Sequence, residues 1–384
     1  MDRSKEKTTA PYPPVGADGG QPLSKTPEQS IAEEQSEHKP QERDFGEILR
    51  QIDRFNNPAY LPTLSMNELY EKVFPGKPPV VEGLLYPGVY LFVGAPKVGK
   101  SFLMAQLGYH VSRGLPLWGY AVHRGTVLYL ALEDDYPRLQ GRLYRMFGVD
   151  GTEHLRFSIN AQTLGGGLEK QLEEFVRERP DTRLIIIDTL QKIREAGDER
   201  YSYASDYDVI TRLKRFADAS GVCVLLVHHT RKQQADDRFD KISGTNGLMG
   251  AADGAFLLQK ERRTDSAATL DISGRDLQDQ RLYLKKDEER LVWELERRET
   301  ELHREPPDEV LEAVAALVTA ERPEWNGTAT DLAAALGLGM KANALAMRLN
   351  VRAGRLAYEY HIRYKSDRTH AGRNISLTLE TPQA

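Results

Sequence analysis

The chain has 384 residues, of which 40% are hydrophobic and 28% are charged, and its formal net charge is -5 at pH 7. These values are typical of a soluble globular protein, and the acidic balance gives no overall attraction to nucleic acid. No apolar run reaches the about 18 residues of a membrane span, and the N-terminus lacks a signal-peptide core, so we expect a cytoplasmic protein without a membrane partner. The only cysteine, Cys223, excludes an intrachain disulfide and a thiolate metal cluster.

The N-terminal part of the chain changes composition near residue 43. Residues 1–43 are rich in Pro, Gly, Ser, Glu, Gln and Lys, and such a segment cannot bury enough surface to fold alone. We expect a disordered tail there. Two helical patterns follow, FGEILRQI and SMNELYEKVF, and Ser65 with Glu68 could form a capping box for the second. Residues 44–82 are therefore interpreted as a helical adaptor segment.

Residues 83–300 alternate short apolar runs with helical patterns. The runs VYLFV, TVLYLAL, RLIIID and VCVLLV are typical of strands, whereas SFLMAQLGYHVSRG, PRLQGRLYRMFG and VITRLKRFADASG are typical of helices. This alternation predicts an α/β domain with a mostly parallel sheet covered on both faces. The later segments ATLDIS, RLYLKK and LVWEL are joined by short turns and predict an antiparallel extension.

The stretch GAPKVGKS directly follows the strand VYLFV and fits the pattern G-x-x-x-x-G-K-S/T. In this pattern backbone N–H groups converge on phosphate oxygens, the lysine reaches the β- and γ-phosphates, and the hydroxyl binds Mg²⁺. A glycine-rich turn without a ligand is the alternative. We predict a site for ATP and Mg²⁺, in which the nucleotide is bound by Gly94, Ala95, Pro96, Lys97, Val98, Gly99, Lys100, Ser101 and Phe102.

Three further polar positions come at strand ends. Asp188 ends RLIIID, where a P-loop protein holds its second metal ligand, so the metal would be bound by Ser101 and Asp188. Glu133 follows TVLYLAL and could polarise the attacking water, or it could belong to an acidic cluster at a helix N-terminus. His229 ends VCVLLVHH and could sense the γ-phosphate; a capping or metal role for the histidine pair is the alternative.

These elements together resemble the RecA-like ATPase core of hexameric replicative helicases, in particular the plasmid RepA helicase group and its relatives on mobile elements. The matching segments are GAPKVGKS, YLALEDD, LIIIDT, LVHHTRK and DISGRD, and the resemblance covers residues 83–295. It implies that Lys100, Glu133, Asp188 and His229 are catalytic. It also implies a ring, expected to be a homo-hexamer, around single-stranded DNA.

The resemblance further implies contributions from other parts of the ring. An arginine of a neighbouring subunit would complete each site; Arg275 is the position carried over, and Arg262 and Arg263 compete for the role. Residues 190–207 and 230–253 would line the pore, and the second range includes the small-residue loop SGTNGLMGAADG. Their basic residues include Lys192, Arg194, Arg231, Lys232, Arg238 and Lys241, among several acids.

A separate small domain is expected at residues 305–384. DEVLEAVAALVTA, TATDLAAALG and KANALAMRLNVRAG predict three short helices, and HIRYKSDRTHAGRNISLTL predicts two strands around a loop. This succession resembles a winged helix. Its basic residues could contact the phosphates of duplex DNA; the candidates are Lys341, Arg348, Arg352, Arg355, Arg363 and Lys365. A domain for protein docking or oligomerisation is the alternative.

The sequence therefore favours a Mg²⁺-dependent ATPase that forms a ring on DNA, as a replicative helicase of a plasmid, phage or integrated element. A second hypothesis is a regulatory or initiator ATPase, which binds DNA and uses ATP to switch its assembly state without processive unwinding. A small-molecule kinase would need an acceptor pocket and a basic lid, and the sequence favours neither.

Overall fold

The computed structural model describes residues 57–74, 76–194, 203–230, 246–262, 264–275, 277–299, 307–369 and 372–380. The expected disordered tail and the helix in FGEILRQI lie outside these residues. The chain divides into two units, Met1–Met66 and Asn67–Ala384. The helix α3 (Met66–Glu71) begins directly after Ser65 and is shorter than the predicted segment. No helix in the described part of the chain is long and apolar enough to cross a membrane.

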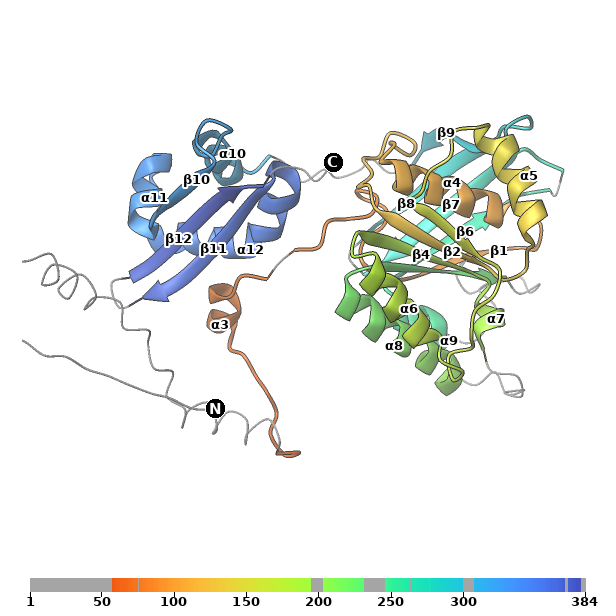
Figure 1. Cartoon of the computed structure of the whole chain (residues 1–384), viewed down its shortest axis with the longest axis horizontal. Helices are drawn as coiled ribbons and strands as arrows, with labels where there is room; N and C mark the ends of the chain where they lie inside the picture. Colours follow the sequence, from red (N-terminus) through yellow and green to blue (C-terminus); the bar gives the residue numbers. More distant parts are fainter. Residues whose placement is uncertain are drawn as a thin grey trace, which may run out of the picture. The chain divides into compact units, whose positions relative to one another are not determined.

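A nine-stranded sheet organises the part of the chain that carries GAPKVGKS (Figure 1). Its strands run in the order β3-β2-β4-β5-β1-β6-β7-β8-β9. The neighbours from β3 to β6 pair in parallel, and those from β6 to β9 pair antiparallel. The predicted mostly parallel sheet is confirmed, and its antiparallel extension is present. The strands are β1 (Gly88–Gly94), β2 (Thr126–Ala131), β3 (Leu155–Ser158), β4 (Thr182–Asp188), β5 (Cys223–His229), β6 (Gly254–Gln259), β7 (Ala267–Gly274), β8 (Leu277–Lys286) and β9 (Trp293–Arg298).

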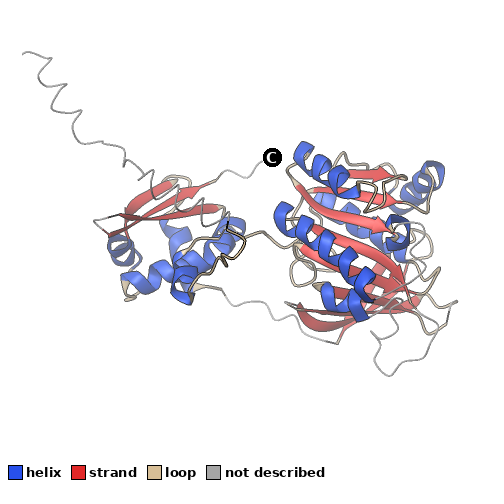
Figure 2. Cartoon of the chain, turned by 90° about the horizontal axis from the view of Figure 1, so that it is seen from below, coloured by secondary structure: helices blue, strands red, loops and turns tan. Residues whose placement is uncertain are grey.

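Helices cover both faces of this sheet (Figure 2). Phe92 and Tyr129 pack in one core with α4 (Lys100–Arg113) and α5 (Tyr136–Phe147). Leu91 and Leu128 belong to a second core on the opposite face. That core includes residues of α6 (Leu168–Glu178), α7 (Leu190–Ile193), α8 (Tyr203–Ser220) and α9 (Asn246–Ala251). Burial on both faces explains why the central strands are continuous apolar runs rather than alternating ones.

The prediction of a small-residue loop at SGTNGLMGAADG is wrong for residues 246–251, which form α9 (Asn246–Ala251). Leu248 of this helix is fully buried in the second core. Apolar packing therefore stabilises a helix that its glycines disfavour, because tertiary burial outweighs intrinsic propensity. Four further elements, β3, α6, α7 and β6, are present where the sequence predicted no helix or strand.

The C-terminal part has its own three-stranded sheet, in the order β10-β12-β11 with antiparallel pairing. Three helices and the two late strands were expected, whereas β10 was not, and α12 is longer than predicted. Asp308 caps the first helix by accepting from the backbone N–H of Val310 and Leu311. A separate buried core holds the part together. Its elements are α10 (Glu309–Leu317), β10 (Glu324–Thr328), α11 (Ala329–Leu336), α12 (Ala342–Tyr360), β11 (Ile362–Thr369) and β12 (Gly372–Leu379).

Candidate nucleotide-binding site

Two glycines shape the loop between β1 and α4. Gly99 has a φ of 111°, in the left-handed region, and a Cβ there would lie 2.8 Å from Cζ2 of Trp293. A Cβ on Gly94 would lie 2.7 Å from the carbonyl oxygen of Leu258. A larger residue at either position would therefore require the surrounding atoms to move. The loop leads into the N-terminus of α4, whose first N–H groups have no partner within the helix and can bind an anion.

Lys100 lies inside this loop and is only 6% exposed. Its Nζ donates to the carbonyl oxygens of Gly94 at 2.8 Å and Ala95 at 3.1 Å. The same Nζ lies 3.2 Å from Nδ1 of His229. Burial lowers the pKa of Lys100 to about 8, although two nearby carboxylates oppose this effect. The ammonium group is thus held by weak neutral acceptors, from which a phosphate could take it over.

Ser101 and Asp188 meet directly across the site. The Ser101 Oγ donates to Oδ2 of Asp188 at 2.7 Å, and the Tyr129 hydroxyl donates to the same oxygen at 2.9 Å. Burial raises the pKa of Asp188, while these two hydrogen bonds act to lower it. Burial also raises the pKa of Tyr129 well above its usual value, so its hydroxyl stays protonated at neutral pH.

Ser101 and Asp188 are better suited to bind Mg²⁺ together with a nucleotide than to form a metal site made of protein ligands alone. The two groups supply one hydroxyl and one carboxylate, both hard oxygen ligands. Within the described ranges, no group of three or more His, Cys, Asp or Glu side chains could hold a metal ion. Mg²⁺ commonly takes one or two protein oxygens and completes its shell with water and phosphate, so the donor set fits.

Glu133 and His229 complete the group at the carboxyl ends of the parallel strands. Glu133 comes two residues after Ala131, which pairs with Asp188. The Thr189 hydroxyl donates to Oε1 of Glu133 at 3.0 Å, and Glu133 is exposed. His229 lies beside Gly94 in the register of β5 and β1. Burial, followed by the charge of Lys100, lowers the pKa of His229, so its ring is neutral near pH 7. The structure thus brings together the predicted catalytic residues other than Arg275.

Arg275 lies near the amino ends of the parallel strands, whereas the P-loop lies at their carboxyl ends. It follows Gly274, which pairs with Gly254, and Gly254 pairs with Tyr90 near the start of β1. The P-loop follows the other end of β1. Arg275 is exposed, and its Nη2 donates to the carbonyl oxygen of Gly250 at 2.8 Å. The placement separates Arg275 from the P-loop of its own chain.

The competing arginine Arg262 follows the carboxyl end of a parallel strand, at the same end of the sheet as the P-loop. It follows the end of β6, where Leu258 pairs with Gly94. Its side chain is exposed, and its backbone N–H donates to Oδ2 of Asp265 at 2.9 Å. Arg263 lies outside the described residues. The two arginines therefore lie toward opposite ends of the parallel strands.

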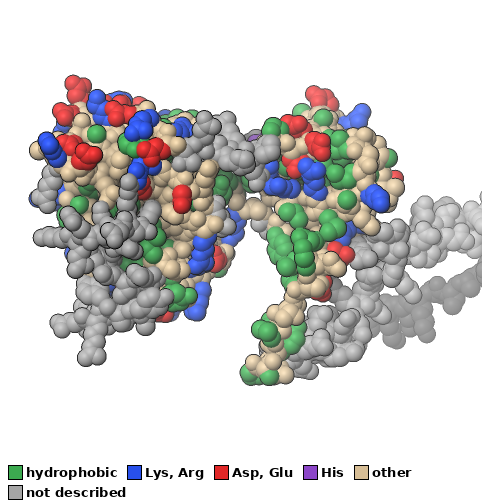
Figure 3. All heavy atoms as spheres, turned by 180° about the vertical axis from the view of Figure 1, so that it is seen from behind, with side chains coloured by type: hydrophobic (Ala, Val, Ile, Leu, Met, Phe, Trp, Pro, Cys, Tyr) green, Lys and Arg blue, Asp and Glu red, His purple; other side chains and the backbone are tan. Residues whose placement is uncertain are grey.

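Most basic residues of the C-terminal part that the sequence singled out have acidic partners. Arg348 pairs with Asp308 at 2.9 Å, and Arg363 pairs with Glu380 at 3.1 Å. Arg352 lies 3.9 Å from Asp308, and Arg355 pairs with Glu359 at 2.5 Å. Figure 3 shows the resulting mixture of Lys or Arg and Asp or Glu side chains on one face.

Lys341 and Lys365 are the exposed exceptions, with no ion pair inside the described C-terminal residues. They are therefore better placed for phosphate contacts than the four arginines. The proposed pore residues Arg231, Lys232 and Lys241 lie outside the described ranges.

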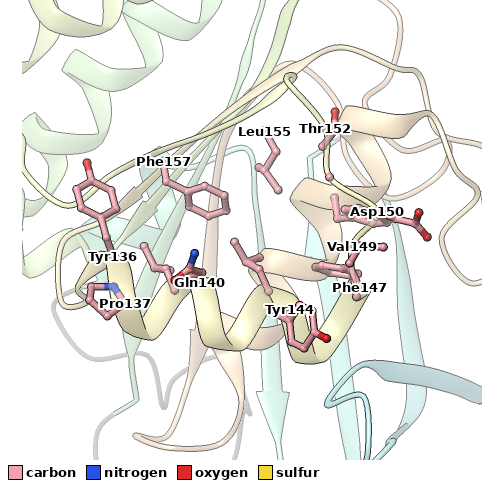
Figure 4. A pocket seen from close by; sticks show the side chains of 15 residues that line it. Tyr136, Pro137, Gln140, Tyr144, Phe147, Val149, Asp150, Thr152, Leu155 and Phe157 are labelled. Atoms are coloured by element: carbon pink, nitrogen blue, oxygen red, sulfur yellow. The ribbon is translucent and has the colours of Figure 1, made fainter.

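A cavity of about 620 Å³ lies along α5 and β3, away from the P-loop (Figure 4). Its lining includes the aromatic side chains of Tyr136, Tyr144, Phe147 and Phe157. None of the nucleotide-binding candidates contributes to it. This cavity is therefore distinct from the candidate site.

Three residues of the site were not predicted. Tyr129 and Thr189 hold the two carboxylates, as described above. The Arg142 guanidinium lies 5.1 Å from the centre of the Phe102 ring, and its Nη2 contacts Asp134 at 2.7 Å. Tyr129 could have been found from the sequence, because a tyrosine within a fully buried strand needs a hydrogen-bond partner for its hydroxyl.

A protein family model matches the part of the chain that carries the site. Residues 56–235 match a protein family described as AAA domain (AAA_25). DNA repair protein RadA of Streptococcus pneumoniae (strain ATCC BAA-255 / R6) is 26% identical over 157 residues, which are 40% of this chain and 33% of that protein. RadA of Streptococcus pyogenes serotype M6 (strain ATCC BAA-946 / MGAS10394) is 24% identical over 157 residues, which are 40% of this chain and 30% of that protein. The match thus spans about a third of the length of these curated relatives.

Two solved structures are also similar. "ATPase Domain of G40P" has a TM-score of 0.45 at 16% identity and covers 54% of this chain and 84% of its own. "The Structure Of A DnaB-Like Replicative Helicase And Its Interactions With Primase" has a TM-score of 0.46 at 14% identity and covers 70% of this chain and 71% of its own. The stretch of this chain that matches the AAA domain family, residues 56–235, is the one that carries the P-loop, Glu133, Asp188 and His229.

Proposed function

We propose that this chain is a Mg²⁺-dependent ATPase that acts on DNA. The observation that carries the proposal is the pairing of Ser101 and Asp188 at 2.7 Å, beside a P-loop whose lysine is buried at the same site. This is the arrangement that phosphoryl transfer needs: a cation for the phosphates and two oxygens for the metal. The match of residues 56–235 to the AAA domain family supports it.

In this proposal each residue has a distinct task. Lys100 leaves its carbonyl partners and neutralises the β- and γ-phosphates, while the N–H groups at the start of α4 bind their oxygens. Ser101 and Asp188 would hold Mg²⁺, and the ion would stabilise the charge that develops on the phosphate oxygens. Glu133 accepts a proton from the attacking water, and the hydrogen bond from Thr189 orients its carboxylate. His229, in contact with Lys100, can respond to the γ-phosphate.

Two observations support DNA as the partner. The curated relatives are named DNA repair proteins, and the match covers a third of their length. The C-terminal order of elements, α10-β10-α11-α12-β11-β12 with sheet order β10-β12-β11, supports a winged helix. Lys341 and Lys365 are its exposed basic candidates for phosphates of duplex DNA.

We further propose that the chain assembles into a ring, as a homo-hexameric replicative helicase of a plasmid, phage or integrated element would. The position of Arg275, exposed and away from its own P-loop, supports this, because an arginine there can complete a site only on another subunit. The second candidate function is a regulatory ATPase that binds duplex DNA and switches its assembly state. The dense pairing of the C-terminal arginines with acids is compatible with either.

Steady-state ATP hydrolysis with and without DNA tests the proposal. A ring helicase should be stimulated by single-stranded DNA, whereas a regulatory ATPase that uses its C-terminal domain should respond to duplex DNA. Turnover that responds to neither would overturn the proposed action on DNA while leaving the ATPase assignment intact. Lys100→Ala is the negative control for contaminating activity.

A further inference from the structure

Tyr129 is a fully buried tyrosine in the middle of β2, with a relative exposure of 0%. Its hydroxyl donates to Oδ2 of Asp188 at 2.9 Å. A weaker contact of 3.5 Å leads to the carbonyl oxygen of Ser101. Burying a phenol hydroxyl is costly unless it finds a partner, so this hydrogen bond is part of how the core is built.

The register of the sheet fixes this contact. In the parallel pair of β2 and β4, Ala131 lies opposite Asp188 and Tyr129 lies opposite Ile186. Side chains two residues apart on a strand point to the same face, so Tyr129 and Asp188 share one face as diagonal neighbours. The aromatic ring packs at 5.5 Å from the ring of Phe157, which limits how far the hydroxyl can move.

Asp188 Oδ2 has two donors in this structure, Ser101 and Tyr129. In the proposed function the Ser101 hydroxyl would become a Mg²⁺ ligand when the nucleotide binds, so its position would depend on the ligand. Tyr129 is the donor whose position does not, because the core sets it.

We propose that Tyr129 is a positioning residue, which orients the Asp188 carboxylate toward Mg²⁺ through a hydrogen bond from its hydroxyl. The inference rests on the proposed function and deepens it by naming a residue that acts through a metal ligand. Partners of this kind tune metal affinity, and their loss typically costs about 10- to 100-fold in metal affinity or activity.

The variant Tyr129→Phe removes one oxygen and keeps the ring beside Phe157. The matched control is Tyr120→Phe, because Tyr120 is also buried and its hydroxyl donates to Oε1 of Gln280 at 3.0 Å. Both variants lose one buried hydrogen bond in the same core. Thermal unfolding should therefore shift to a similar extent in the two, and a difference in metal dependence cannot be ascribed to general destabilisation.

Nucleotide binding gives a readout other than turnover. The affinity for a fluorescent ADP analogue is measured in EDTA and in a Mg²⁺ titration. We expect Tyr129→Phe to bind the analogue in EDTA as the wild type does, and to need about tenfold more Mg²⁺ for half of the Mg²⁺-dependent gain. Tyr120→Phe should follow the wild-type titration. The Mg²⁺ concentration for half-maximal ATP hydrolysis should shift in parallel.

A double-variant cycle with Asp188→Ala isolates the route of the effect, because alanine removes the acceptor of the Tyr129 hydroxyl. If Tyr129 acts through the Asp188 carboxylate, Tyr129→Phe should change the Mg²⁺ dependence little in the Asp188→Ala background. Equal Mg²⁺ titrations for Tyr129→Phe and Tyr120→Phe, with a normal wild-type response, would overturn this inference alone. A wild-type chain that gains no affinity from Mg²⁺ would overturn the proposed function, and this inference with it.

Discussion

The Nζ of Lys100 lies 3.2 Å from Nδ1 of His229, although 129 residues separate them in the chain. The parallel pairing of β1 and β5 produces this contact, because Gly94 and His229 are opposite one another in the register. The residue expected to bind the β- and γ-phosphates therefore touches the residue expected to sense the γ-phosphate. A nucleotide that draws Lys100 toward its phosphates would change the surroundings of His229 at the same time.

Replacing Lys100 tests the phosphate contact. Lys100→Ala should weaken binding of a fluorescent ATP analogue by about tenfold or more, since a hydrogen-bonded charge opposite a phosphate is removed. Lys170→Ala is the matched control, because Lys170 is an exposed lysine of α6 that belongs to none of the candidate sites. Equal loss of affinity in both variants would contradict a specific role for Lys100.

The pH dependence of nucleotide binding follows from the lowered pKa of Lys100, about 8 in the free chain. Phosphate oxygens bind the protonated ammonium, so binding should raise this pKa. The affinity for ADP should be fully present below pH 8 and should fall by up to about tenfold per pH unit as the pH rises above it. A titration from about pH 7 to 9.5 measures this fall. Lys100→Met should be weak and flat over that range, and a flat wild-type profile would oppose the assignment.

The part of the fold that could be predicted is the part with continuous apolar strands. The runs ending in Asp188 and His229 are buried on both faces, which is typical of a parallel sheet. The strand β3 was not predicted because it has only four residues and Leu155 is its only buried one. The helix α9 was not predicted because its glycines disfavour a helix. The burial of Leu248 that stabilises it depends on residues of the sheet that are distant in sequence.

The candidate site was predictable where a residue follows a strand within a local pattern. Asp188 and Glu133 both do, and the sheet register brings them together. Tyr129 was not identified because a tyrosine inside an apolar run has the same pattern as core, and its role depends on the pairing of β2 with β4. The acidic partners of Arg348 and Arg363 come from other elements of the C-terminal part, so sequence alone overstated its basic surface.

Binding of DNA by the C-terminal part can be tested in the full chain through its two exposed lysines. Replacing Lys341 or Lys365 by alanine should weaken duplex DNA binding and lower the slope of log K against log salt by about 0.9 for each phosphate that is no longer neutralised. Lys170→Ala is the control, because it removes one exposed positive charge from α6, outside the C-terminal part. Unchanged DNA binding at low salt in both lysine variants would favour a protein-docking role for this part.

The role of Arg275 in assembly predicts complementation between subunits. Arg275→Ala should bind ATP normally and hydrolyse it about 10³-fold more slowly, because the transition state loses a positive charge. Mixed with Lys100→Ala subunits, it should recover partial turnover at interfaces that combine an intact P-loop with an intact arginine. Subunit exchange must be verified first, and Arg262→Ala serves as the comparison at the P-loop edge. Near-normal turnover by Arg275→Ala would refute the assignment and direct attention to Arg262.

The most direct test of the account is Mg²⁺-dependent ATP hydrolysis by the wild type and by Glu133→Gln, measured with single-stranded DNA present. Glutamine keeps the size of the side chain and can still contact Thr189, but it cannot accept the proton of the attacking water. We predict turnover by the wild type, unchanged ATP affinity in the variant, and a loss of about 10²- to 10⁴-fold in its turnover. A wild-type chain that binds no ATP, or a Glu133→Gln variant that hydrolyses ATP at the wild-type rate, would contradict the account.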